Sequence, residues 1–161
     1  EKYLLLSLED EKYKQSDKVY VYFSLAENYR FWNLKTPKYD KAIKYYNKIL
    51  NSEFNLTTLN ANDSISSFLN AGFITQTYIG DKDSALELYR KGVQFYEKNI
   101  DEFTDIDEAK DSMSLILYNI GTLYEQKNEN MKAVNYYNKS IEIYPENSPA
   151  YNNLGLVQLP F

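Results

Sequence analysis

The chain has 161 residues, of which 43% are hydrophobic, and its formal net charge at pH 7 is −5. This composition suffices for a folded core, and no stretch approaches the roughly 18 apolar residues that a membrane-spanning helix requires. The acidic balance argues against non-specific nucleic-acid binding, and the absence of Cys and His removes disulfides, thiolate chemistry and the commonest general base and metal ligand.

Residues 2–14 are expected to form a short helix that packs Leu4, Leu5 and Leu8 onto the helices that follow. The segment 1–17 is either a dedicated N-terminal cap or the second helix of a repeat severed upstream. No basic n-region precedes the leucines, so the sequence shows no signal peptide. The chain reads like a piece of a longer protein; a cytoplasmic location is favoured, with a removed leader left open.

Residues 18–51 predict a pair of helices. The second helix covers residues 39–50, and its Ala42 provides a small position at which a neighbouring helix can approach. In the first helix Ala26 is the best counterpart of such a small position. Phe31 and Trp32 either pack under the N-terminal helix, which we favour, or form an aromatic anchor at one end of a ligand groove.

Residues 62–98 predict a second pair of helices. The first of these, Asp63–Ile79, is followed by Gly80, which is expected to end the helix in a left-handed conformation. The next helix is expected to begin with Asp81 or Asp83 as its N-cap, because a carboxylate oxygen accepts a hydrogen bond from the free amides of the first turn.

Residues 107–145 predict a third pair of helices, in which Gly121 and Ala133 leave room for a neighbouring backbone. Residues 148–161 restate the first helix of that pair and form a truncated fourth repeat. Gly155 lies 34 residues after Gly121, so the two first helices are related by a fixed period.

The spacing of the earlier helices is less regular. Gly72 and Ala85 are 13 residues apart, against 12 for the equivalent pair in the third repeat, so one extra residue is expected in the turn. Successive second helices are 43 and 48 residues apart. These periods predict extended helices or longer loops, notably at 51–62 and 99–107.

An acidic run at residues 101–108 raises the question of calcium binding. The run lacks the alternating acidic spacing and the central glycine of a calcium-binding loop. It is better interpreted as a junction between two helices, with Asp105 or Asp107 as the N-cap of the second.

The third repeat resembles the tetratricopeptide repeat, whose pattern runs aromatic-x2-L-G-x2-Y, then A-x3-F, then P. The positions that match are Leu117, Ile120, Gly121, Tyr124, Ala133, Tyr137 and Pro145. The resemblance covers residues 18–158 and is strongest in 114–161. It implies an all-α fold, a right-handed α-solenoid of about three and a half stacked helix–turn–helix repeats, forming one domain over residues 1–161.

In this family the first helix of each repeat lines a concave groove. Two residues before each glycine the chain carries the same side chain, as Asn70, Asn119 and Asn153. These residues resemble the asparagine ladder that holds an extended peptide in some members, since a side-chain amide can both donate to and accept from a peptide backbone. The alternative is that each Asn bonds only to a neighbouring helix.

Further residues are expected on the same face and give a neutral, amphipathic and partly aromatic groove: Phe73, Gln76, Thr77, Tyr118, Thr122, Gln126 and Leu156. For Phe73 and Tyr118, packing between repeats is an equal alternative. Members that bind the acidic C-termini of heat-shock proteins use a clamp of Lys and Arg on these helices. At the corresponding positions this chain has Leu69, Phe73, Tyr118 and Thr122, so that co-chaperone role is not expected.

The resemblance therefore implies a protein–protein interaction module, part of a larger scaffold, that binds an extended or short helical peptide in its concave groove. Its partners are expected to be proteins or peptides, without nucleic acid, membrane insertion, cofactor, metal or catalytic residues, so no enzymatic activity is expected. Two alternatives stay open. One is a sensory or regulatory segment of a histidine kinase or transcription regulator. The other is an architectural module that self-associates through its C-terminal end, around Tyr151, Leu154 and Val157.

Overall fold

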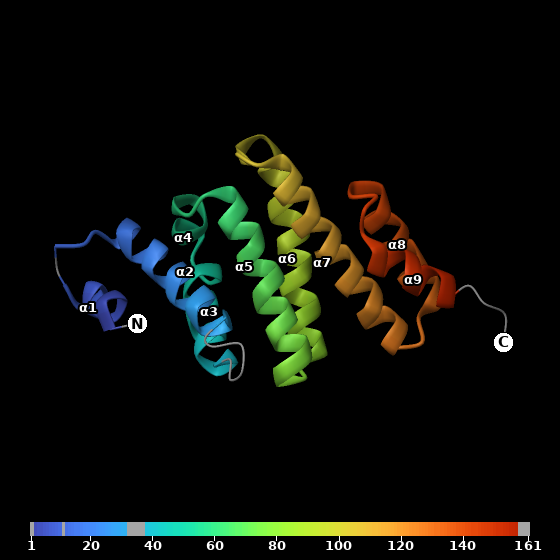
Figure 1. Ribbon diagram of the computed structural model, residues 1–161, viewed down its shortest axis with the longest axis horizontal. Helices are drawn as coiled ribbons and strands as arrows, with labels where there is room; N and C mark the ends of the chain where they lie inside the picture. Colours follow the sequence, from blue (N-terminus) through green and yellow to red (C-terminus); the bar gives the residue numbers. More distant parts are fainter. Residues whose placement is uncertain (1, 11, 32–37, 158–161) are drawn as a thin grey trace.

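The computed structural model describes residues 2–10, 12–31 and 38–157. The helices follow one another along a single elongated stack, with α1 at one end and α9 at the other (Figure 1). Trp32, considered above as an anchor, lies outside the described residues. The elements are α1 (Lys2–Glu9), α2 (Gln15–Phe31), α3 (Tyr39–Leu50), α4 (Glu53–Thr58), α5 (Ala61–Ile74), η1 (Thr75–Ile79), α6 (Lys82–Lys98), η2 (Ile100–Glu102), α7 (Ile106–Gln126), α8 (Asn130–Ile143) and α9 (Ser148–Val157).

The long helices pack as successive hairpins. Helix α2 packs against α3, α5 against α6 and α7 against α8, while α9 packs on α8 and α7. Each hairpin also contacts the next one through α5, which touches both α3 and α7. The predicted all-α solenoid of stacked helical repeats is confirmed. Below, α2, α5, α7 and α9 are called the inner helices, and α3, α6 and α8 the outer helices.

A tyrosine of each later outer helix fills the space left by a glycine of its inner helix. A Cβ atom at Gly72 would lie 2.3 Å from the ring of Tyr89, and one at Gly121 would lie 2.6 Å from the ring of Tyr137. Both rings are fully buried, as is Ala133. The predicted close approach of two helices at Gly121 and Ala133 is confirmed, and a tyrosine ring occupies it.

Helix α5 starts two residues earlier than expected. Asn60, not Asp63, is its N-cap, and the Asn60 side-chain oxygen accepts a hydrogen bond from the Asp63 amide at 2.8 Å. The segment before it, predicted as part of a lengthened connection, contains the short helix α4. The second lengthened connection contains the 3₁₀ turn η2.

The extra residue of the second repeat lies inside the helix and not in the turn where we expected it. Helix α5 continues into the π-helical turn η1, which takes up one residue more than an α-helical turn. Gly80 ends it with φ of +81°, and the Thr75 carbonyl accepts hydrogen bonds from the amides of Gly80 and Asp81 at 2.9 and 3.1 Å. The predicted left-handed glycine cap is confirmed.

Helices α6 and α7 each begin directly after an aspartate that serves as N-cap. The Asp81 side chain accepts from the Ser84 amide, and the Asp105 side chain accepts from the Glu108 amide, each at 3.0 Å. Of the alternatives considered, Asp81 and Asp105 are therefore the N-caps. Helix α8 ends before Pro145, where Tyr144 takes an extended conformation, as the proline predicts.

A buried polar cluster joins α7, α8 and the start of α9. The Ser114 hydroxyl donates to the Ser140 carbonyl at 2.9 Å, and the Ser140 hydroxyl donates to the Ser114 carbonyl at 2.8 Å. The Asn147 amide donates to both hydroxyls, at 2.7 and 3.0 Å, while its oxygen accepts from the Ala150 amide at 3.2 Å. One side chain thus caps α9 and fixes it to the preceding hairpin.

The N-terminal helix is only peripherally attached. Leu4, Leu5 and Leu8 pack against the core between α2, α3 and α5, as predicted, but α1 contains no buried residue. Within the described ranges, no helix is both long enough and apolar enough to span a bilayer.

Candidate functional site

The inner helices form one face of the stack. Helices α5 and α7 contact each other directly and lie in front of α6 in the view of Figure 1. Residues on the outward side of α5 and α7 therefore share a surface that the outer helices do not cover. This surface, here called the inner face, is where the sequence predicted a groove.

A cavity of about 270 Å³ opens between α5 and α7 on the inner face. Three residues from each helix line it: Leu69, Asn70, Phe73, Leu115, Tyr118 and Asn119. Four of these, Asn70, Phe73, Tyr118 and Asn119, belong to the predicted site. The sequence analysis did not place Leu69 and Leu115 among the binding residues. Leu115 was recognisable because it precedes Asn119 by one helical turn and so lies on the same face of the helix.

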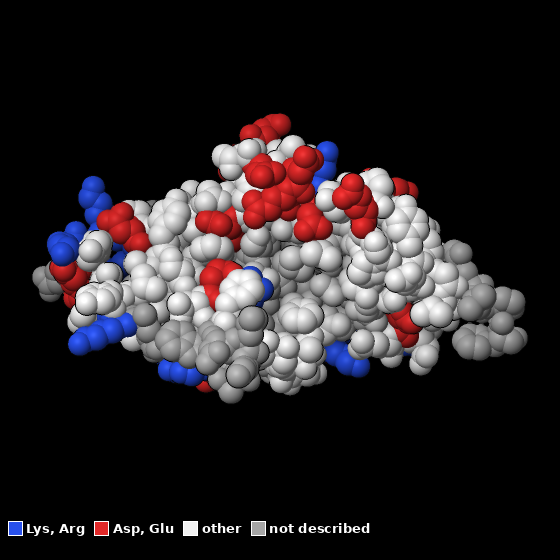
Figure 2. Space-filling view, viewed as in Figure 1, with Lys and Arg blue, Asp and Glu red and all other residues white. Residues whose placement is uncertain are grey.

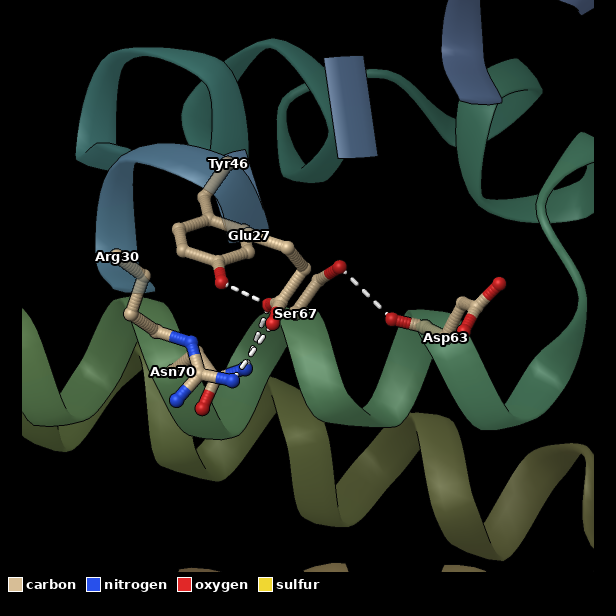
Figure 3. A network of polar contacts seen from close by, with 6 residues as sticks. All are labelled: Glu27, Arg30, Tyr46, Asp63, Ser67 and Asn70. Carbon is tan, nitrogen blue, oxygen red and sulfur yellow. Dashed lines mark hydrogen bonds and ion pairs between the residues drawn. The ribbon is translucent and has the colours of Figure 1, made fainter. Parts of the chain in front are cut away.

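Asn70 is already held within the chain. Its Nδ2 atom donates to Oε1 of Glu27 at 3.0 Å, and the same carboxylate accepts from the Tyr46 hydroxyl and from Nη2 of Arg30, the latter at 2.6 Å. Figure 3 shows these side chains converging from α2, α3 and α5. Asn70 therefore connects the second hairpin to the first while it also lines the cavity.

Burial and charge fix the protonation of this network. Burial and the nearby Glu27 carboxylate raise the pKa of the Tyr46 hydroxyl, so it stays a neutral donor. Burial disfavours the charge of Arg30, but the hydrogen bond to Glu27 and the other interactions with Glu27 and Tyr46 together more than offset this, so the pKa of the guanidinium is raised. In this network Tyr46 is therefore a neutral donor and Arg30 a cationic donor to the side chain of Glu27.

Asn153 is held in a comparable way two repeats further on. Its Nδ2 atom donates to the hydroxyl oxygens of Tyr137 at 3.2 Å and of Tyr118 at 3.4 Å. The Tyr137 hydroxyl in turn donates to Glu125 at 2.5 Å, and burial together with this carboxylate raises the pKa of Tyr137. Both Asn70 and Asn153 thus contact the tyrosine–carboxylate pair of the preceding repeat.

Asn119 differs from the other two. Over the described ranges of the chain, its side-chain amide forms no hydrogen bond; only its backbone carbonyl is engaged, by the Thr122 hydroxyl at 2.8 Å. The place of an inter-repeat bond is taken by Gln76, which accepts from Tyr89 at 3.1 Å and donates to Thr122 at 3.3 Å. Asn119 is therefore the asparagine whose amide stays open toward the cavity.

The remaining predicted residues do not line this cavity. Gln76 and Thr122 join η1 to α7 beside it. Thr77, Gln126 and Leu156 are exposed, and Leu156 keeps 62% of its surface accessible. Phe73 is 43% exposed, and its ring packs edge-on against Tyr78 with centroids 6.1 Å apart, so it forms a wall of the cavity that is open to solvent.

A larger cavity, of about 440 Å³, lies on the opposite side between α6 and α8. Its floor is apolar, with Met113, Leu117 and Ile120 of α7. Its rim carries charges of both signs, including Arg90, Lys139, Glu97 and Glu142. None of the predicted site residues lies there. We favour the smaller cavity as the candidate site because the amide and aromatic groups converge on it.

Charge on the inner face is unevenly distributed. Figure 2 shows carboxylates gathered over the α6–α7 turn and the start of α7, whereas the surface over the middle of α7 is free of charged groups. In the part of the chain that the structure describes, the acidic residues do not form a group that would hold a metal ion. The cavity itself is neutral and mixed apolar and amide in character.

Comparison with known proteins agrees with this architecture. A family model described as tetratricopeptide repeat matches residues 114–147, and a second model of the same description matches residues 136–160. The chain is also similar to two proteins named Photosystem I assembly protein Ycf3. The one from Rippkaea orientalis is 30% identical over 81 residues, covering 45% of this chain and 47% of that protein. The one from Acaryochloris marina is 30% identical over 81 residues, covering 45% and 49%. The chain thus spans about half the length of these relatives.

Proposed function

We propose that this chain, which matches tetratricopeptide repeat models over residues 114–160, is a protein-interaction module that binds an extended or short helical peptide in the cavity between α5 and α7. The observation that carries the proposal is the convergence of Asn70, Phe73, Tyr118 and Asn119 on one opening. Asn70 and Asn119 are 49 positions apart in the sequence, and the stacking of α5 on α7 brings them together.

The chemistry of the cavity suits a peptide. Leu69, Leu115 and the ring of Phe73 provide an apolar lining for one ligand side chain, since a volume near 270 Å³ accommodates a leucine or an aromatic ring. The open amide of Asn119 can donate to and accept from the backbone beside that side chain. One pocket and a few hydrogen bonds correspond to a dissociation constant on the order of micromolar.

We further propose that the module acts without catalysis of its own, as a holder of other polypeptides. The names of the two relatives describe an assembly role, in that case for photosystem I. By analogy, the second candidate function for this chain is transient binding of a segment of a subunit that has not yet been assembled into its complex. It uses the same cavity and differs only in the source of the peptide.

Peptides selected from a random display library on the purified chain test the proposal. Asn119→Ala is expected to weaken a selected peptide about five- to tenfold, the loss of one net hydrogen bond, without lowering the melting temperature. Phe73→Ala is expected to weaken it further through lost apolar contact. Asn70→Ala is expected to lower the free energy of unfolding by about 1 kcal/mol instead, because it removes the bond to Glu27.

The matched control is Lys139→Ala on the opposite side of the stack, which should change neither affinity nor stability. If the selected peptides bind the Asn119→Ala and Phe73→Ala variants as tightly as the unchanged chain, the cavity is not the binding site. The self-association alternative is tested in the same preparation by sedimentation velocity, where a concentration-dependent dimer would favour it.

A further inference from the structure

The two inner helices that form the cavity change character along their length in the same direction. On α7, Asp111, Leu115 and Tyr118 follow one another at intervals of four and three residues and so share one side of the helix. On α5, Asp63 precedes Asn70 by two helical turns, and Figure 3 shows both on that helix. Each helix thus carries a carboxylate one or two turns before the residues that line the cavity.

The acidic starts of α5 and α7 lie at the same edge of the inner face. Asn62, the neighbour of Asp63, donates through Nδ2 to the Asp105 carbonyl at 2.7 Å and to Oε2 of Glu108 at 3.3 Å. Figure 2 shows carboxylates gathered over the start of α7. We call Asp63, Glu108 and Asp111 the acidic edge of the groove.

Among the residues that the structure describes, no cation forms an ion pair with the acidic edge. None of the ion pairs among the described residues includes Asp63, Glu108 or Asp111. The Asp63 carboxylate accepts from the neutral side-chain amide of Asn60, at 2.6 Å. Burial raises the pKa of both Asp63 and Asp111, as it does for a carboxylate that lacks a cationic partner.

The nearby cations do not change this balance. Lys110 is the single basic residue in the stretch 101–111, which contains six acidic residues. Arg30, beyond Asn70 on the other side of α5, is paired with Glu27. A cationic ligand group therefore meets an uncompensated negative field at one side of the cavity, and an anionic one is repelled there.

We propose that the groove selects a basic peptide, in which an apolar or aromatic side chain enters the cavity and a neighbouring Lys or Arg reaches the acidic edge. This inference rests on the proposed function, because it assigns the chemistry of the ligand of that same cavity. Rim charges of this kind add little affinity each, but they set the orientation of the ligand and speed its association, and salt screens them.

The test uses the same random display library. Peptides that need the cavity are expected to carry an apolar or aromatic residue and to be enriched in Lys and Arg and depleted in Asp and Glu. For such a peptide, Asp63→Asn/Asp111→Asn is expected to weaken binding about tenfold at low ionic strength, with a much smaller effect near 0.5 M salt. The single variant Asp111→Asn gives a smaller loss of the same kind if the pair folds poorly.

The matched control is Glu97→Gln/Glu142→Gln, which removes two carboxylates from the opposite side of the stack and should leave the affinity unchanged. Cavity-dependent peptides without basic enrichment, or an equal loss in both variant pairs, would overturn the inference while leaving the proposed function standing. Peptides that ignore Asn119→Ala and Phe73→Ala would remove the proposed function itself, and this inference with it.

Discussion

At the residue scale, Gly121 and Gly155 occupy the same place in successive repeats but meet different surroundings. A Cβ atom at Gly121 would overlap the ring of Tyr137, whereas at Gly155 such an atom would have no described atom within 4 Å beyond its chain neighbours and its own helix backbone. The sequence alone treats the two glycines as equivalent. The structure separates a glycine required by packing from one that only follows the repeat pattern.

This difference gives a paired prediction. Gly121→Ala is expected to lower the free energy of unfolding by about 1–3 kcal/mol, because Tyr137 is fully buried and cannot move away without strain. Gly155→Ala is expected to raise it by up to about 1 kcal/mol, because alanine favours the helix. Urea denaturation followed by circular dichroism measures both. Equal effects of the two substitutions would show that the tyrosine–glycine contact is not what restricts position 121.

Residue-level patterns predicted part of the lining of the cavity between α5 and α7. The fixed position of Asn before each glycine placed Asn70 and Asn119 on the cavity correctly, because helical periodicity determines which face a residue occupies. Periodicity did not reveal that the three asparagines have different partners. Those partners, Glu27 for Asn70 and the two tyrosines for Asn153, come from other helices, and their positions depend on how the repeats stack.

At the element scale, the ends of the helices explain what sequence reasoning could and could not predict. Gly80, Asp105 and Pro145 end or begin helices through local backbone chemistry, so their roles were readable from the sequence. Helix α4 and the π turn η1 could not be predicted from the sequence, because in both segments tertiary packing decides between alternative local structures. Asn147 was also missed, since its capping role depends on two serines from the preceding hairpin.

Asn147 supports the strongest prediction at this scale. Asn147→Ala removes the N-cap of α9 and leaves the buried hydroxyls of Ser114 and Ser140 with fewer partners, so it is expected to lower the free energy of unfolding by about 2–3 kcal/mol. Asn152→Ala, on the exposed side of the same helix, is expected to change it by less than about 0.5 kcal/mol. Thermal melts of the two variants provide the comparison, and similar melting temperatures would rule out the capping role.

At the scale of the whole molecule, stability is distributed along a line. Among the described residues, each hairpin packs against its neighbours along the stack, and the helices differ in how many residues they bury. Helix α7 contributes ten buried residues, whereas α1 contributes none. A stack of this kind opens from its weakly buried parts and keeps its centre folded longest.

Hydrogen exchange should follow this gradient. Amides of α5 and α7 are expected to exchange only through near-global unfolding. Amides of α1 are expected to exchange through local opening, at a rate at least a hundredfold faster, which corresponds to a difference in opening free energy of about 2.7 kcal/mol. Mass spectrometry of peptic fragments after timed exchange at neutral pH measures the difference. Uniform protection from α1 to α7 would show that the stack unfolds as one unit.

The π turn at the end of α5 has a consequence for how such a chain can vary. Tyr89 follows Gly72 by 17 residues and Tyr137 follows Gly121 by 16, yet both rings rest on the glycine backbone in the same way. An added residue was absorbed by a local widening of the helix, at no cost to the contact that sets the stack. The length of a repeat can therefore change by one residue without changing how the helices stack. We expect the array to tolerate one-residue insertions at the ends of its inner helices.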